Sequence, residues 1–270
     1  MNLSDRFLHC EDAPTNPPSF LIDRTPGLFT YLSALRDNLE DVQMFGSVPD
    51  ANLALGCHGE NIAEVLRIFG KSAVLEALRH PRTQSLSTLS IQVEQWMSEF
   101  VPRVKLRVEI CAGLDAVGLR YLQGGYRNDW VRPANTGFGL TYCLPIVVAG
   151  LLARPGSLFI VDSPEAHLHP AAQSAMGQFL ARLAAQGIQV VIETHSDHII
   201  NGIRLAAVHP EHPFQSREAQ FHFLDRNDDE LRHHSITMTA SGGLSEYPGR
   251  FFDQSEIDLR RIIDARTAKP

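Results

Sequence analysis

Two stretches decide the fold: LFIVDSPE over residues 158–165 and VVIETHSD over residues 190–197. Each is a short apolar run that ends in polar side chains, which is typical of a buried strand in a parallel sheet. One predicted helix, residues 171–185, separates them, and this order favours neighbouring parallel strands joined by a right-handed crossover. The ends of both strands would then meet at one edge of the sheet, where ligands collect in open α/β folds.

Asp162 and His195 follow these two strands, and Glu165 lies shortly after Asp162. A carboxylate at a strand end commonly holds the Mg²⁺ of a nucleoside triphosphate, directly or through water. His195 can polarise a terminal phosphate and order the attacking water, and Glu165 can hold water or metal. The competing interpretations are a strand-end cap for Asp162, a helix cap for Glu165, and a hydrogen-bonded core side chain for His195.

The segment NTGFG, residues 135–139, opens a helix predicted over residues 139–152. Glycines at a helix start let backbone N–H groups approach an anion, and the helix dipole adds to the attraction. Asn135, Gly137 and Gly139 are therefore candidate nucleotide-binding residues. An ordinary tight turn explains the same glycines without a ligand.

The three segments together resemble an ABC-type ATP site. NTGFGLTYCLPIVVAGL, LFIVDSPEAHLHPAAQ and VVIETHSDHIING look like the signature, Walker B with D-loop, and His-switch segments of the SMC/RecF-like and OLD-like AAA ATPases. The later string GLSEYPGRFFDQ resembles the tail of an uncharacterised branch of that group. The resemblance covers residues 135–253 and implies an ABC-ATPase-like fold.

The resemblance also implies roles and cofactors, which are ATP and Mg²⁺. Asp162 would be the metal residue, and His195 the switch histidine. The glycine segment would touch the γ-phosphate held by a partner ATPase chain or by a second copy in a head-to-tail dimer. The Leu168-His169-Pro170 segment would cross that dimer as the D-loop. A role on nucleic acid or in phage defence follows by family analogy alone.

Two departures from the family pattern limit this interpretation. Ser163 occupies the usual place of the catalytic Glu and is not a strong general base at neutral pH; Glu165 is the candidate to replace it. Gly70-Lys71-Ser72 imitates the end of a phosphate loop, but Val65 stands where the first glycine belongs, and an amphipathic helix precedes it where a strand is required. We therefore expect no phosphate loop in this chain.

Three functions are compatible with these features. The first is half of a split ATPase whose partner supplies the phosphate loop. The second is a binding or regulatory module that docks on a complete ATPase without hydrolysing ATP. The third is a metal-dependent hydrolase built on histidines, namely His167, His169, His195 and His198.

The pattern also predicts two parts of the chain. Residues 1–100 read as a mostly helical subdomain, with helices over residues 26–45, 60–78 and 86–100, and residues 101–270 read as the C-terminal lobe of an ABC-type ATPase. In the second part we expect two antiparallel strands near residues 103–110 and 116–122. The remaining strands and helices alternate, ending in strands over residues 220–224 and 231–239 and a helix over residues 254–265.

Composition excludes some classes of protein. The 270 residues carry a net charge of -7, so the whole molecule does not attract nucleic acid or anionic membrane. Arg127, Arg132 and the basic strand face of Arg103, Lys105 and Arg107 could form a local basic patch, although a solvated face is the simpler interpretation. The longest apolar run, residues 143–153, is too short to span a bilayer. Four cysteines without a CxxC pair, and no signal peptide, favour a cytoplasmic protein.

Overall fold

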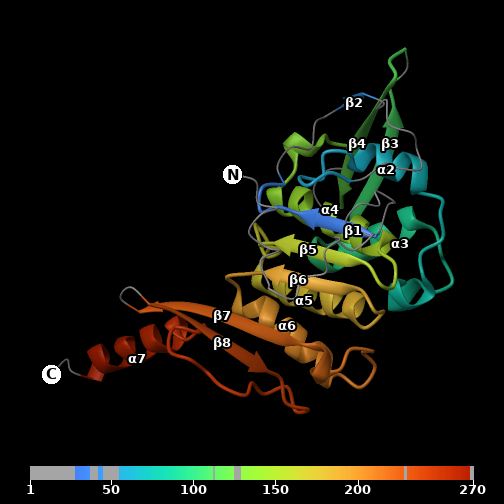
Figure 1. Ribbon diagram of the computed structural model, residues 1–270. Coiled ribbons are helices and arrows are strands. Elements are labelled where there is room, and N and C mark those ends of the chain that lie inside the picture. Colours follow the sequence, from blue (N-terminus) through green and yellow to red (C-terminus); the bar gives the residue numbers. More distant parts are fainter. Residues whose placement is uncertain are drawn as a thin grey trace.

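The computed structural model describes residues 28–36, 42–44, 55–111, 113–124, 129–227 and 230–267 (Figure 1). These residues form an α/β fold with a parallel sheet, which confirms the predicted fold class. The sheet contains β1 (Phe29–Leu32), β5 (Leu158–Asp162) and β6 (Gln189–Glu193) in the order β1-β5-β6. All pairs are parallel, so the prediction that the two decisive strands are neighbours is confirmed.

Within the described residues, the helix predicted over residues 26–45 is wrong. The chain there forms β1 and the short strand β2 (Gln43–Met44). The apolar spacing fits a helix, but Phe, Thr and Tyr favour a pleated surface, and Leu32 gains full burial by pairing with Val161 of β5. β1, which precedes residue 100, therefore belongs to the same sheet as β5 and β6. The domain boundary expected between residues 100 and 101 stays a prediction.

The second predicted helix is shorter than expected. α2 (Ile62–Phe69) ends at Gly70, and two 3-10 helices follow at Glu76–Leu78 and Pro81–Thr83. Gly70-Lys71-Ser72 thus follows a helix and not a strand, which is the wrong context for a phosphate loop. α3 (Leu89–Phe100) forms close to its predicted range.

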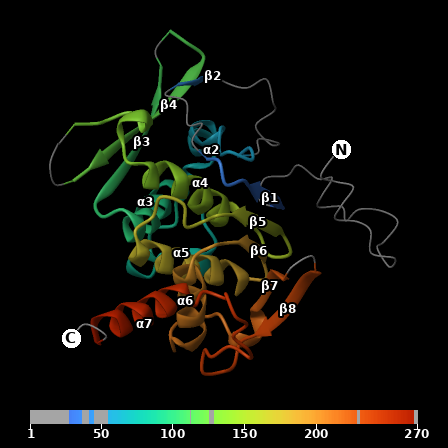
Figure 2. The same ribbon diagram turned by 90° about the vertical axis from the view of Figure 1, so that its left-hand side faces the viewer.

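The remaining strands are antiparallel. β3 (Val104–Ile110) and β4 (Ala116–Gln123) make the predicted pair, and β2 joins the other edge of β4. β7 (Gln220–Asn227) and β8 (Glu230–Thr237) form a separate hairpin. α7 (Gln254–Thr267) closes the described chain with no buried residue, and Figure 2 shows it at the far side from β3 and β4.

Three helices pack beside the parallel sheet: α4 (Phe138–Leu152), α5 (Pro170–Ala184) and α6 (Asp197–Val208). Figure 2 shows them together on one side of β1, β5 and β6. α4 is buried on nearly every face, as its apolar sequence predicts. A 3-10 turn at Pro133–Asn135 precedes it. None of the helices in the described ranges is long and apolar enough to cross a membrane.

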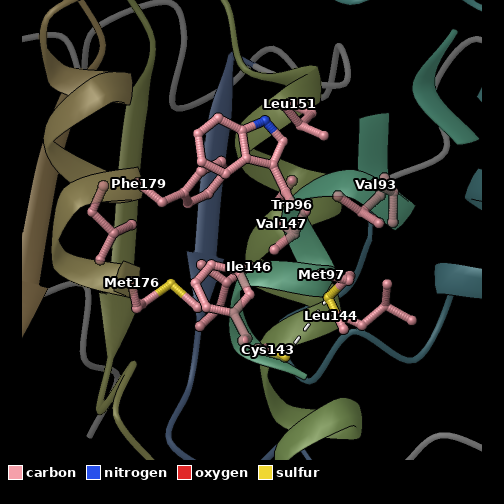
Figure 3. Close-up of a cluster of buried hydrophobic side chains, with 14 of the residues drawn as sticks. Val93, Trp96, Met97, Cys143, Leu144, Ile146, Val147, Leu151, Met176 and Phe179 are labelled. Atoms are coloured by element: carbon pink, nitrogen blue, oxygen red, sulfur yellow. Dashed lines mark hydrogen bonds between the residues drawn. The ribbon is translucent and has the colours of Figure 1, made fainter. Parts of the chain in front are cut away.

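The core joins these helices to α3. Trp96 packs against Phe179 with ring centroids 5.0 Å apart, and Trp96 Nε1 donates to the carbonyl of Leu78. Below them the Cys143 thiol contacts Met97 at 3.7 Å (Figure 3). Burial raises the pKa of Cys143 to about 12, so this thiol is a core side chain and not a nucleophile. The described cysteines are all free thiols: Cys57, Cys111 and Cys143.

Glycines bring α5 and α6 into backbone contact. A Cβ added to Gly177 would lie 2.3 Å from the carbonyl oxygen of Ile199, and one added to Gly202 would lie 2.1 Å from that of Ser174. Neither neighbour is a flexible side chain, so the helices would have to separate. Since α6 carries the chain away from the end of β6, this contact also fixes the residues that follow that strand.

We predict that Gly202→Ala lowers the free energy of unfolding by about 1–3 kcal/mol, because the added methyl group overpacks a backbone contact. Urea unfolding followed by circular dichroism measures this change. Gly249→Ala is the matched control, since a Cβ at Gly249 meets no atom within 4 Å. Equal stability of the two variants would contradict the close contact between α5 and α6.

Candidate functional site

Carboxylates from both parallel strands meet at one edge of the sheet. Asp162 of β5 is the register partner of Glu193 of β6. Ser163 links them, because its Oγ donates to Asp162 Oδ1 at 2.9 Å and to Glu193 Oε2 at 3.1 Å. Ser163 has a φ of 47°, a conformation that costs a non-glycine residue free energy and is concentrated at functional sites. The edge therefore presents several oxygen atoms within a small space.

Glu193 is a site residue that the sequence analysis quoted but did not single out. Burial raises the pKa of its carboxyl, and the adjacent Asp162 raises the pKa further. Two neighbouring carboxylates favour binding of a proton or a cation between them. Its position at the end of a predicted strand, aligned with Asp162, was the signal that could have identified it.

Glu165 holds the segment after β6 in place. Its Oε2 accepts a hydrogen bond from Thr194 Oγ1 at 2.7 Å, and its Oε1 accepts one from the backbone N–H of His195 at 2.8 Å. Both oxygens of the candidate catalytic carboxylate are thus engaged within the chain. The geometry makes Glu165 a positioning residue, and its role as a general base stays a prediction.

His195 projects into solvent at the same edge. Its side chain is 89% exposed, and its Nε2 lies 3.4 Å from Glu193 Oε1. The interpretation of His195 as a core side chain is therefore wrong. The next residue, Ser196, caps α6 by accepting from the N–H groups of His198 and Ile199.

Arg36 is a buried cation that binds the backbone of this edge. Its side chain donates to the carbonyl oxygens of Asp162 at 2.6 Å and Ser163 at 2.7 Å, and also to those of Ser33 and Tyr142. Burial lowers its pKa from the ordinary value. Arg36 lies inside the helix predicted over residues 26–45 and was therefore not a candidate; a lone arginine just after an apolar strand-like run was the available signal.

The glycine segment lies near this edge but does not form part of it. Gly139 sits against the backbone of His167, where an added Cβ would be 3.0 Å from the carbonyl oxygen. The His167 ring packs against Phe138 and Tyr142 of α4. Asn135, at the end of the 3-10 turn, and Gly137, the N-cap of α4, are both exposed. A contact between them and a nucleotide on another chain stays a prediction.

The histidines do not gather into one metal site. His169 Nδ1 accepts from the backbone N–H of Ala171 at the start of α5, and His198 Nε2 lies 3.7 Å from Asp197. Within the ranges that the structure covers, no group of three or more His, Cys, Asp or Glu side chains could hold a metal ion. This arrangement gives the metal-dependent hydrolase no support.

Comparison with known protein families agrees with the geometry of the central region. Residues 98–201 match the family described as "AAA domain, putative AbiEii toxin, Type IV TA system", and residues 215–262 match "Protein of unknown function (DUF3696)". The central region is thus similar to an AAA domain over residues 98–201. No curated protein matches the chain.

Three of the solved structures to which the chain is similar carry titles that name SMC ATPases or Smc heads. One comes from "Structural biochemistry of ATP-driven dimerization and DNA stimulated activation of SMC ATPases", with 13% identity, a TM-score of 0.41, and coverage of 64% of this chain and 90% of that chain. Another is an SMC head bound to the C-winged helix domain of ScpA, with 12% identity, a TM-score of 0.43, and coverage of 67% and 47%. A third is an Smc head domain with an extended coiled coil from Pyrococcus furiosus, with 12% identity, a TM-score of 0.40, and coverage of 64% and 37%.

We predict that Arg36→Met costs on the order of 3 kcal/mol of stability, because it removes several charge-assisted hydrogen bonds from buried carbonyl groups. Arg82→Met is the control, since that side chain is 76% exposed. Urea unfolding gives the stability, and the NMR chemical shifts of Asp162 and Ser163 show whether the edge moves. Unchanged stability and shifts would show that Arg36 does not hold the edge.

Proposed function

We propose that this chain supplies the magnesium-binding and γ-phosphate-facing half of an ABC-type ATP site, and that a partner supplies the phosphate loop. The observation that carries the proposal is the meeting of Asp162, Glu193 and His195 at one edge of a parallel sheet. This is where open α/β folds place their ligands. The match of residues 98–201 to an AAA domain supports the same conclusion.

The residues present fit a magnesium ion. Mg²⁺ prefers oxygen ligands, and it is usually held by one or two carboxylates together with waters and substrate phosphates. Asp162 would hold the ion, and Glu193 and the Ser163 hydroxyl stand close enough to orient its waters. When bound, the ion would neutralise phosphate charge and would relieve the repulsion between the two carboxylates.

The chain's own residues divide the remaining tasks. His195 is free to approach a terminal phosphate or to orient a water, because its ring is exposed beyond the strand end. Glu165 holds the backbone of His195 and the side chain of Thr194, so that the ring stays beside the edge. The Gly137 and Gly139 start of α4 would contact the γ-phosphate of a nucleotide held by another chain, either a partner ATPase or a second copy.

A second candidate is a regulatory module that binds nucleotide or a partner without hydrolysis. Ser163 is not a strong base, and both oxygens of Glu165 already accept hydrogen bonds. These two observations favour the non-hydrolysing alternative over a self-sufficient enzyme. Cytoplasmic placement, expected from the cysteine pattern, and a phage-defence role, expected from the family resemblance, belong to the same proposal.

Nucleic acid as a substrate receives little support from the predicted basic face of β3, and Arg127 of the expected basic patch lies outside the described residues. On β3 the basic side chains are already paired: Lys105 with Glu94 at 3.2 Å, and Arg107 with Glu109 at 3.0 Å. Such pairs leave little unbalanced positive charge for phosphate groups. A nucleic-acid contact would have to come from another surface or from the partner.

The test is a titration with Mn²⁺ and ATP followed by NMR, because Mn²⁺ broadens resonances close to it. We expect broadening centred on residues 162–165 and 193–195. We expect Asp162→Asn to weaken the affinity for Mn²⁺ by about tenfold or more. Asp197→Asn is the matched control, since its side chain is partly exposed nearby but lies outside the edge.

Broadening that is unaffected by Asp162→Asn would refute the proposal. Broadening centred on Lys71 and lost in Lys71→Ala would instead establish a phosphate site in the turn after α2. Turnover of ATP by the chain together with its partner, lost in both Asp162→Asn and His195→Ala, would decide for hydrolysis over the regulatory module.

A further inference from the structure

The geometry points to the free edge of β6 as the docking site of a second polypeptide, which adds a parallel strand there and continues from it into a phosphate loop. The identity of that loop rests on the proposed function, whereas the strand addition rests on the sheet itself. Four features of the described chain carry the inference: an open edge, an uncovered face, an apolar trough and an unbalanced group of carboxylates.

The first feature is the open edge. The N–H of Gln189 donates to Ser157, and the carbonyl of Glu193 accepts from Ser163, so these residues direct their backbone groups toward β5. Alternation along a strand then directs the N–H and C=O groups of Val190 and Ile192 the other way. Among the described strands, β6 pairs only with β5. An unpaired edge of this kind is a template for another strand.

The second feature is an uncovered face of the parallel sheet. Tyr31, Ile160 and Val191 are register partners and point to the same side. Tyr31 is 43% exposed and Val191 is 45% exposed, whereas Phe159 and Val161, on the opposite side, are fully buried. Parallel sheets are normally covered on both faces. The apolar side chains of the open face therefore indicate a layer that the described chain does not supply.

The third feature is an apolar trough between β6 and β7. It is a cavity of about 720 Å³ whose walls include Val190 and Ile192 of β6 and Phe221 and Phe223 of β7. Its floor comes from α5 and α6, through Leu180, Ala184 and Ile203. In Figure 1, β7 lies beside β6. A strand laid in the trough would run between these two strands.

The fourth feature selects the occupant. A parallel strand beside β6 would end next to Glu193 and His195, and a phosphate loop is the segment that follows a strand and opens a helix. The carboxyl ends of the strands hold three carboxylates, Asp162, Glu165 and Glu193, against one buried cation, Arg36, whose hydrogen bonds go to carbonyl oxygens. The lysine of a phosphate loop would supply the missing positive charge. The helix after that loop could then cover the exposed face of Tyr31 and Val191.

The experiment uses the full chain without nucleotide and a synthetic peptide as the probe. The peptide has an apolar valine and isoleucine segment as long as β6, which has 5 residues, flanked by lysines. A control peptide of the same length carries prolines that remove the donors of the added strand. We expect the first peptide, and not the second, to slow hydrogen exchange at Val190 and Ile192.

A nitroxide label reports the orientation. With the label at the carboxyl end of the peptide, we expect broadening of Glu193 and His195; with the label at the amino end, we expect broadening near Gly187. Antiparallel binding, binding at another edge, or no slowing of exchange would overturn the proposal. The nucleotide is absent throughout, so loss of Mn²⁺ and ATP binding with intact strand addition would refute only the proposed function.

Variants that fill the trough provide the second test. Ala184→Phe and Ala219→Phe place a ring among the lining residues, and we expect each to weaken peptide binding by about tenfold or more. Ala240→Phe adds the same ring at an exposed position outside the trough and should bind like the parent chain. Circular dichroism confirms that the variants fold, and equal binding by all three would contradict the proposed location.

Discussion

The candidate site depends on the parallel pairing of β5 with β6. That pairing ends both strands at the same edge and so forces Asp162 against Glu193. The edge is held by Arg36, whose hydrogen bonds go to the carbonyl groups of Asp162 and Ser163 and not to the Asp162 carboxylate. A buried cation is thus used to shape the backbone, while the surface of the edge keeps its negative charge. This division of roles is what makes the edge suitable for a metal ion or a basic partner.

The sequence was sufficient to predict the strands and helices from residue 86 onward because their patterns are local. β5 and β6 are continuous apolar runs, and the helix that follows each of them has a clear start, at Pro170 for α5 and at Ser196 for α6. β1 could not be found in this way. It has only four residues, its apolar spacing also fits a helix, and the partner that stabilises it begins at Leu158, far along the chain.

The site was only partly predictable for a related reason. Residue types and strand ends were enough to select Asp162, Glu165 and His195, but a sequence does not show which lone pairs are already used. The structure shows Glu165 engaged by Thr194 and by the backbone of His195, which makes it a positioning residue. Glu193 was recognised as a site residue from the strand register, because the register places it beside Asp162.

The apolar sequence of β6 predicts a strand buried on both faces, but the strand is partly exposed in the structure. Its residues Val190, Val191 and Ile192 have the composition of a strand buried on both faces, yet each is at least partly exposed in the described chain. Apolar strands of this kind gain free energy only when they are covered. The mismatch is therefore a property of an incomplete sheet and not of a poorly formed strand. It locates the missing cover along β6, whose carboxyl end carries Glu193 beside Asp162, and this coincidence joins the two proposals.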